Sequence, residues 1–371
     1  MRRVSIEGSR RFWPLVALAL AACHATAHSP APASASAAAA ATTPAKPLYP
    51  TIGAVERLDP ALDALIAPDA KVEKLAEGFT WAEGPVWTTE GGGALLFSDV
   101  PNNVIHRWKD GEGVTDFLKP SGYTNQKVPR GGNLGSNGLT FDGAGHLILC
   151  QHGDRRIARL EPDRSFATVA GRFEGRRFNS PNDVVVRSNG DVYFTDPPYG
   201  FEGVDPKIDP PELHFAGVYH RNAKGVVKLL TKEMKFPNGI AFSPDEKILY
   251  VSNSDPDRAI WMAFDVKPDG GVANGRLFFD ATAMVKAGNG KKPGLPDGMK
   301  IDEHGNLFAG GPGGVLVFSP AGKHLGTIVT GEPTANVAFG PNESGGSTLY
   351  MTAHDKLCRI HLETRAASRD R

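Results

Sequence analysis

A short motif recurs six times along the 371-residue chain, and this repeat restricts the fold more than any other feature of the sequence. Each copy begins with a polar residue and continues with an apolar strand, a turn rich in Asp, Gly or Asn, and a second apolar strand. The polar residues that open the copies are Glu83, Asn137, Asn182, Asn238, Asp297 and Asn336. They are 39 to 59 residues apart, which brackets the spacing of about 40–50 residues typical of four-stranded propeller blades.

The repeat predicts an all-β fold, a six-bladed β-propeller, over residues 51–371. The composition agrees, because 43 glycines and 29 prolines in a chain with 40% hydrophobic residues indicate many short strands joined by turns. The segment near residues 72–75 precedes the first copy. We expect it to supply the closing strand of the last blade, so that no sheet edge stays open.

The first 50 residues are expected to lie outside the fold. Residues 1–22 combine an arginine-rich start with a short apolar run, as in a secretory signal. Small residues before Cys23 resemble the lipobox of bacterial lipoproteins; an ordinary signal-peptidase site is the alternative. Residues 23–50 are rich in Ala, Pro, Ser and Thr, so they indicate a flexible tether. The predicted location is extracytoplasmic and periplasmic, with a lipid on Cys23 as the only membrane contact.

The charge balance excludes partners held by bulk electrostatics. The chain has 41 basic and 41 acidic residues, so neither nucleic acid nor an acidic membrane surface is an expected partner. Three cysteines cannot build a disulfide framework, and Cys150 and Cys358 are expected to be buried free thiols. The sequence leaves the oligomeric state open.

The six opening residues also predict a metal site in the central channel. Equivalent positions of successive blades point toward the same channel, so these oxygen-bearing side chains should converge there. Carboxylate and amide oxygens suit Ca²⁺, with Mg²⁺ or Mn²⁺ as alternatives and Zn²⁺ less natural without His or Cys. The competing interpretation is that Asn and Asp before Gly merely mark turns, but this does not explain Glu83.

Five motifs resemble the gluconolactonase branch of the regucalcin/gluconolactonase superfamily. The resemblance covers about residues 70 to 360, and its motifs lie at residues 83–87, 180–185, 196–200, 236–246 and 296–299. It implies a six-bladed propeller that holds one divalent metal, usually Ca²⁺, and hydrolyses lactones.

The resemblance also assigns site residues. It implies that Glu83, Asn182, Asn238 and Asp297 bind the metal, and that Asn182 also lies near the substrate. Asp297 would act as general base or would only orient the attacking water. The chain departs from the regucalcin pattern at Ser180, where regucalcin-like members place an arginine for sugar hydroxyls, and this puts the sugar specificity in doubt.

Four further side chains are candidate substrate contacts. Asn137 is one of the six opening residues of the repeat, so it should lie at the level of the metal. His152 and His354 follow the second strands of their repeats. Tyr123 lies in a long insertion, residues 109–135, that is expected to fold over the channel mouth. The alternatives are a structural role for each histidine and packing of Tyr123 on its own loop.

The sequence therefore predicts a metal-dependent enzyme that hydrolyses a sugar lactone, gluconolactone-like, to the aldonic acid. One alternative keeps the site and changes the substrate to another lactone or ester. Another is a non-catalytic propeller, stabilised by metal, that binds a sugar or a protein.

Overall fold

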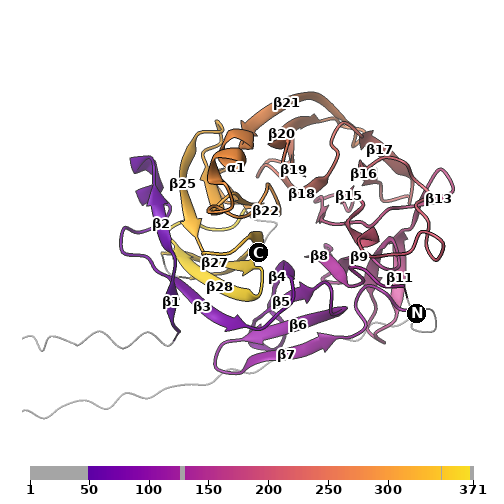
Figure 1. Cartoon of the computed structure of the whole chain (residues 1–371), viewed down its shortest axis with the longest axis horizontal. Coiled ribbons are helices and arrows are strands. Elements are labelled where there is room, and N and C mark those ends of the chain that lie inside the picture. Colours follow the sequence, from indigo (N-terminus) through magenta and orange to yellow (C-terminus); the bar gives the residue numbers. More distant parts are fainter. Residues whose placement is uncertain (1–48, 126–129, 344, 368–371) are drawn as a thin grey trace, which may run out of the picture. The chain divides into compact units, whose positions relative to one another are not determined.

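The computed structural model describes residues 49–125, 130–343 and 345–367, and the signal, lipidation and most of the tether predictions fall outside them. Within the unit Pro47–Arg371, six antiparallel sheets of four or five strands follow one another around a common axis (Figure 1), and a separate two-stranded sheet pairs β12 (Arg172–Phe173) with β13 (Arg176–Arg177). The predicted six-bladed β-propeller is confirmed. No helix among the described residues is long and apolar enough to cross a bilayer.

The first three blades follow the chain order. Blade 1 consists of β4 (Ala82–Thr88), β5 (Ala94–Asp99), β6 (Val104–Lys109) and β7 (Gly113–Leu118). Blade 2 consists of β8 (Ser136–Phe141), β9 (Leu147–Gln151), β10 (Arg156–Leu160) and β11 (Phe166–Ala170). Blade 3 consists of β14 (Val184–Val186), β15 (Val192–Asp196), β16 (Gly217–Arg221) and β17 (Val227–Thr231).

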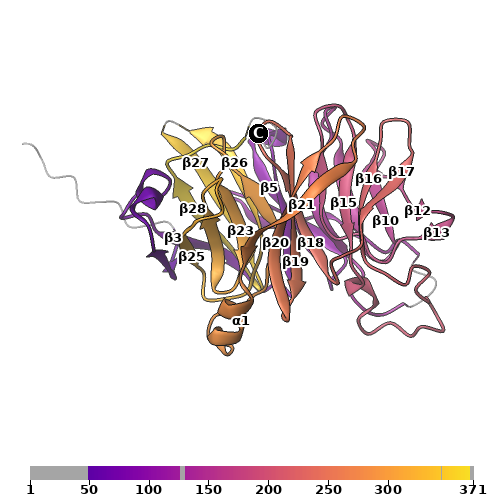
Figure 2. The ribbon, with the colours of Figure 1, turned by 90° about the horizontal axis from the view of Figure 1, so that it is seen from above.

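The last three blades complete the ring. Blade 4 consists of β18 (Pro237–Phe242), β19 (Ile248–Asp255), β20 (Arg258–Val266) and β21 (Val272–Asp280). Blade 5 consists of β22 (Met299–Ile301), β23 (Leu307–Gly311), β24 (Gly314–Phe318) and β25 (His324–Val329). Blade 6 contains β26 (Thr334–Glu343), β27 (Gly346–Ala353) and β28 (Lys356–Leu362). A short helix, α1 (Thr282–Gly288), lies beyond the strand ends on one side of the propeller (Figure 2).

The segment that begins at Val72 closes the ring, as the sequence predicted. The strand β3 (Val72–Glu77) pairs with β28 in antiparallel register and supplies the outer strand of blade 6. Two shorter strands that the sequence analysis did not anticipate extend the outer edges: β1 (Thr51–Ile52) pairs with β3, and β2 (Ala54–Arg57) pairs with β25 of blade 5. Residues 51–77 are thus part of two blades.

Six apolar clusters hold the blades together, one between each pair of neighbours. The alternation of strand residues explains them, because successive side chains point to opposite faces of a sheet. In β9, for example, Leu149 packs toward blade 1 and Cys150 toward blade 3. Trp108 of blade 1 meets Tyr350 of blade 6, with ring centroids 5.7 Å apart. Cys150 and Cys358 are buried free thiols, as predicted.

Candidate metal and substrate site

A cavity of about 600 Å³ lies at one end of the central channel, and all six blades contribute residues to its lining. Five of the six opening residues of the sequence repeat line it: Glu83, Asn137, Asn182, Asn238 and Asp297. The predicted convergence therefore occurs for five of the six side chains, and Asn336 is absent from the lining. Each comes from a different blade, because each stands just before or at the start of an innermost strand.

Three amide oxygens face this cavity without a partner. The side chains of Asn137, Asn182 and Asn238 are at most 5% exposed, and their Oδ1 atoms have no hydrogen-bond donor within the part of the chain that the structure describes. A buried polar atom left unsatisfied costs about 1–3 kcal/mol. Three such oxygens on one cavity indicate a site for a group that accepts lone pairs, as a cation does.

The orientation of Asn238 is set by its neighbours. Its Nδ2 donates to Ser254 Oγ at 3.0 Å, and that hydroxyl donates to the carbonyl oxygen of Pro296. This chain of donors fixes the amide nitrogen on Ser254, while Oδ1 has no partner among the described residues. Because Pro296 precedes Asp297, the same network links two of the candidate ligands.

Two carboxylates complete the donor set. Glu83 is 2% exposed, and its Oε2 accepts hydrogen bonds from the backbone N–H of Gly84 and from Asn336 Nδ2. Asp297 Oδ1 accepts the N–H of Gly298 at 3.0 Å. Burial, followed by repulsion from neighbouring carboxylates, raises the pKa of both acids. A divalent cation would offset that cost, so three amides and two carboxylates fit a hard metal ion.

Asn336, the sixth opening residue, has a supporting position. Its Oδ1 accepts the N–H of Val337 at 2.8 Å, and its Nδ2 lies 3.2 Å from Glu83 Oε2. Both ends of the amide are therefore used inside the protein. Asp183, which lies within the motif at residues 180–185, is also structural. It is 2% exposed, and it joins blades 3 and 4 by accepting the N–H of Ile240 at 3.2 Å.

The glycines that follow the opening residues have a packing role that the turn interpretation missed. At Gly84, Gly239 and Gly298, an added Cβ would lie 2.2 Å or less from an atom of the next blade's opening residue. These three glycines are therefore needed because successive blades touch there, not only because the chain turns.

Replacing Gly239 by alanine is expected to destabilise the propeller by about 1–3 kcal/mol, because the new methyl group would lie 2.2 Å from the carbonyl oxygen of Asp297. Chemical denaturation would measure the change. The control is Gly143→Ala, where an added Cβ has no neighbour within 4 Å among the described residues. Equal stability of the two variants would contradict the packing role.

Polar residues at the ends of second strands brace the loops that precede the ligands. Asp196 accepts the N–H groups of Asn179 and Ser180 at 2.8 Å, ahead of Asn182. Asn253 does the same for Phe236, ahead of Asn238, at 3.0 Å. These residues act through the backbone and are absent from the cavity lining.

Of the three other predicted substrate contacts, the structure places only His152 in the cavity lining. His152 is 1% exposed and lines the cavity. Tyr123 is half-buried and outside the lining; its backbone N–H donates to Asn103 Oδ1 at 3.1 Å, and its carbonyl oxygen accepts from Asn103 Nδ2. His354 is also outside the lining. Its ring packs edge-to-face with the ring of Trp81, with the ring centroids 5.3 Å apart.

The acidic cluster beside His354 does not need a metal ion. Glu332 and Asp355 each lie 3.9 Å from His354 Nδ1, so the three could resemble a metal site. The ammonium of Lys356, however, lies 2.7 Å from a carboxylate oxygen of each acid. That ammonium group already pairs with both carboxylates and offsets part of their charge.

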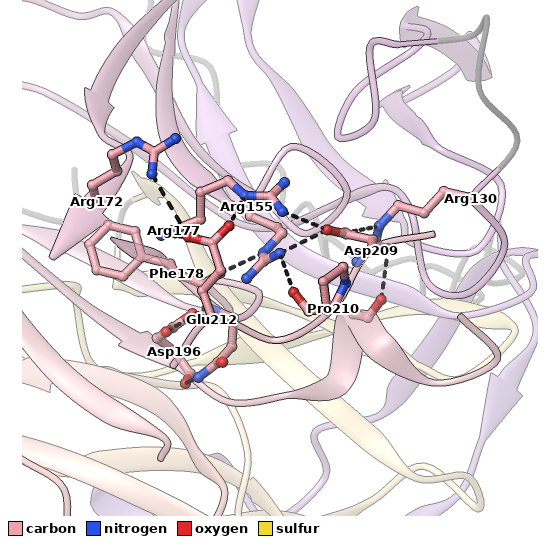
Figure 3. Close-up of polar contacts among 11 residues, drawn as sticks. Arg130, Arg155, Arg172, Arg177, Phe178, Asp196, Asp209, Pro210 and Glu212 are labelled. Carbon is pink, nitrogen blue, oxygen red and sulfur yellow. Dashed lines mark hydrogen bonds and ion pairs between the residues drawn. The ribbon is translucent and has the colours of Figure 1, made fainter. Parts of the chain in front are cut away.

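Two segments between strands, residues 130–135 and 197–216, both contribute to the cavity lining and are joined by a buried ion pair (Figure 3). Arg130 is 4% exposed; its Nε donates to Asp209 Oδ2 at 2.7 Å, and its Nη1 donates to the carbonyl oxygen of Gly200 at 2.8 Å. Asp209 Oδ1 also accepts from Arg155 and Arg177, at 2.8 and 2.9 Å. The contacts hold the segment that carries Asn133 against the segment that carries Tyr199 and Glu202.

Several residues that the sequence pattern did not predict also line the cavity: Trp81, Asn133, Tyr199, Glu202 and Ser254. Tyr199 was visible only as part of a family motif. Its ring stacks on Phe236 at 5.7 Å, and burial raises its pKa, so the phenol stays protonated. Asn133 and Glu202 lie in insertions outside the repeat, where periodicity carries no information.

The comparisons with known proteins agree with this geometry. Residues 81–355 match the model of the SMP-30/Gluconolactonase/LRE-like region. A gluconolactonase of Zymomonas mobilis is 39% identical over 321 residues, covering 85% of this chain and 87% of the relative. The pentonolactonase XacC of Haloferax volcanii is 26% identical over 73% of this chain and 80% of its own length. The solved structure of XC5397, a gluconolactonase of Xanthomonas campestris, superposes with a TM-score of 0.71 at 30% identity, over 86% of this chain and 99% of that one.

Proposed function

The chain belongs to the SMP-30/gluconolactonase/LRE-like family, and from this membership we propose that it is a lactonase that hydrolyses a sugar lactone to its aldonic acid. The reaction would use one divalent cation, with Ca²⁺ as the expected ion and Mg²⁺, Mn²⁺ or Zn²⁺ as alternatives. The observation that carries the proposal is the set of three unpartnered amide oxygens and two buried carboxylates on one cavity.

In this proposal Glu83, Asn182, Asn238 and Asp297 hold the cation, and Asn137 contacts water or substrate from the same level of the channel. A bound cation supplies Lewis acidity that polarises the lactone carbonyl. Asp297 acts as the general base that accepts a proton from the attacking water. Its Oδ1 is held by the N–H of Gly298, which leaves Oδ2 to take a proton from the attacking water.

The remaining steps conserve atoms and charge. The water oxygen bonds to the carbonyl carbon, and the bond between that carbon and the ring oxygen breaks. Asp297 then returns its proton to the departing ring oxygen, which becomes a hydroxyl group of the open acid. Tyr199 remains protonated because burial raises its pKa, so it can donate a hydrogen bond to a substrate oxygen from the cavity lining.

A second candidate substrate is a lactone or ester with an apolar substituent. The observation that favours it is the apolar part of the lining, which includes Trp81, Val100 and Leu295. Ser180 also favours this substrate, because regucalcin-like members have an arginine at this position to bind sugar hydroxyls. This alternative keeps the metal and Asp297 and changes only what the rest of the cavity contacts.

Removal of metal by a chelator is expected to abolish turnover and to lower the midpoint of thermal unfolding. A ligand present at 100 times its dissociation constant stabilises the fold by about 2.7 kcal/mol. Acid release from gluconolactone and thermal unfolding would be followed before chelation, after it, and after refilling with each of the four ions. Full turnover by the chelated protein would contradict the metal dependence, and no turnover on any lactone, with metal still stabilising the fold, would favour the binding-module alternative.

The location outside the cytoplasm and the lipid on Cys23 remain proposals from the sequence pattern alone. Both concern residues outside the described part of the chain. A lactonase held at the membrane by a tether would meet lactones formed by oxidation of sugars outside the cytoplasm.

A further inference from the structure

His152 is the least satisfied side chain in the cavity lining. It is 1% exposed, and among the residues that the structure describes neither Nδ1 nor Nε2 has a hydrogen-bond partner. Buried polar side chains are nearly always hydrogen-bonded, so two unpaired ring nitrogens on a ligand cavity indicate that the missing partners come with the ligand.

We propose that His152 is a specificity residue that hydrogen-bonds hydroxyl groups of the substrate and thereby makes polyhydroxylated lactones, and not alkyl lactones, the substrates of this site. The inference rests on the proposed lactonase function and adds to it the residue that recognises the hydroxyl groups of the substrate. It assigns the hydroxyl contact to blade 2, where His152 follows β9.

The imidazole is suited to hydroxyl groups because it is neutral. Burial lowers the pKa of His152 to about 3, and the positive charge of Arg130 contributes in the same direction. A neutral imidazole offers one N–H donor and one nitrogen acceptor. A hydroxyl group can pair with either, whereas a methylene group can pair with neither.

The backbone and Cβ of His152 are closely packed. The backbone N–H of His152 donates to the carbonyl oxygen of Gly135 at 3.2 Å. At Gly200 an added Cβ would lie 3.3 Å from the Cβ of His152, so this glycine lets the two segments approach. Arg130, which donates to the carbonyl oxygen of Gly200, fixes that segment in turn.

Ser180 does not supply the hydroxyl contact in place of the arginine. Its Oγ donates to the carbonyl oxygen of Pro197 at 2.6 Å and accepts the N–H of Gly200 at 2.8 Å. The side chain is 0% exposed and absent from the lining. Ser180 therefore stabilises the turn beside the cavity, and the recognition of hydroxyl groups falls to other residues.

The position of His152 fits a role away from the reacting bond. It belongs to blade 2 and Asp297 to blade 5, and these blades lie opposite each other in a ring of six (Figure 1). A lactone whose carbonyl carbon lies near Asp297 would turn its far substituents toward His152. Asn133 and Glu202, whose side chains are 3.4 Å apart, add polar atoms to the lining.

The expected discrimination is large. An alkyl lactone in this cavity leaves the buried nitrogens unpaired, and sites built to bind a substrate hydroxyl reject analogues that lack it by factors of about 10⁴–10⁵. We expect the wild-type protein to prefer δ-gluconolactone over δ-valerolactone in kcat/KM by at least about 100-fold.

The test compares these two lactones in the metal-loaded wild type and in His152→Phe, which keeps a planar ring and removes both nitrogens. The expected result is a fall of at least about 100-fold in kcat/KM for δ-gluconolactone, with δ-valerolactone unchanged or faster. His152→Gln, which keeps a donor and an acceptor, should recover part of the loss. His304→Phe, on an exposed turn with the side chain 68% exposed, should match the wild type.

Other outcomes would overturn the inference. Equal losses on both lactones would place His152 in the chemistry or in folding, and thermal unfolding of His152→Phe would separate those two causes. If His152→Phe keeps the wild-type ratio of kcat/KM for the two lactones, His152 does not bind the substrate hydroxyl groups, and the lactonase function is unaffected. Failure of the metal-loaded wild type on every lactone would overturn the proposed function as well.

Discussion

The Asp297→Asn variant is expected to lose activity by about a thousandfold or more in kcat, since a positioned base contributes about 10²–10⁴ and the substitution also weakens a candidate metal ligand. Asparagine keeps the side-chain volume and an oxygen for the N–H of Gly298, which Asp297 Oδ1 accepts at 3.0 Å. The variant therefore removes the charge and the basic oxygen and leaves the local backbone intact. Initial rates of acid release at saturating metal would measure the loss.

The two roles of Asp297 can be separated in the same variant. Metal-dependent stabilisation, followed by thermal unfolding, reports ligation without reference to turnover. Lost turnover with retained stabilisation would assign Asp297 as base, and loss of both would assign it as ligand. Full turnover with normal metal stabilisation would contradict both roles. Asp257→Asn is a suitable control, because the Asp257 side chain is 86% exposed.

The Asp209→Asn variant is expected to lose about 3–5 kcal/mol of unfolding free energy, the cost of breaking a buried ion pair from one side. Asp209 is 7% exposed and accepts from Arg130, Arg155 and Arg177. Arg130 and Arg155 are themselves at most 4% exposed, so the substitution leaves two buried guanidinium groups without their carboxylate. Chemical denaturation at neutral pH would measure the change.

The matched control is Asp265→Asn. Asp265 also pairs with an arginine, Arg276, at 2.7 Å, but the two side chains are 44% and 47% exposed, and exposed pairs contribute only about 0–1 kcal/mol. If both variants lose the same small amount, the buried cluster does not stabilise the fold as proposed.

The effect of Asp209 should also depend on pH. Burial alone would raise its pKa, but hydrogen bonds and charge from Arg130 and Arg155 outweigh burial and lower it. A carboxylate with a lowered pKa in the folded state stabilises the fold above its unfolded pKa of about 3.9. The stability gap between wild type and Asp209→Asn should therefore be full at neutral pH and narrow as the pH falls below about 4.

The fold could be predicted because a propeller repeats its sequence pattern. The six opening residues located the blades, and the register of apolar residues around them follows from the two-residue period of strands. The closing strand near Val72 was predictable because a ring leaves no free edge. Strands β1 and β2, with two and four residues, are too short to leave a pattern in the sequence.

The site was predictable only where it belongs to the repeat. Glu83, Asn137, Asn182, Asn238 and Asp297 meet in the cavity because equivalent positions share a level of the channel. Arg130, Asp209, Asn133 and Glu202 lie in insertions, and their contacts join parts of the chain about 70 to 80 residues apart. Such pairings leave no periodic pattern in the sequence. For this reason the prediction chose Tyr123 from the insertion, whereas Asn133 is the residue of that insertion in the cavity lining.

The closing pair of strands also has a consequence for the order of events in folding. Arg359 of β28 and Glu73 of β3 are 286 positions apart and form an ion pair at 2.7 Å. Contacts at such separation form slowly, because a long loop must close before they can form. Five blades can assemble while the chain is being synthesised, whereas blade 6 cannot be completed until β28, near the C-terminus, has been synthesised. Until then the edges of β3 and β28 stay open to other strands, so the interval between synthesis and ring closure is when this protein is most exposed to aggregation.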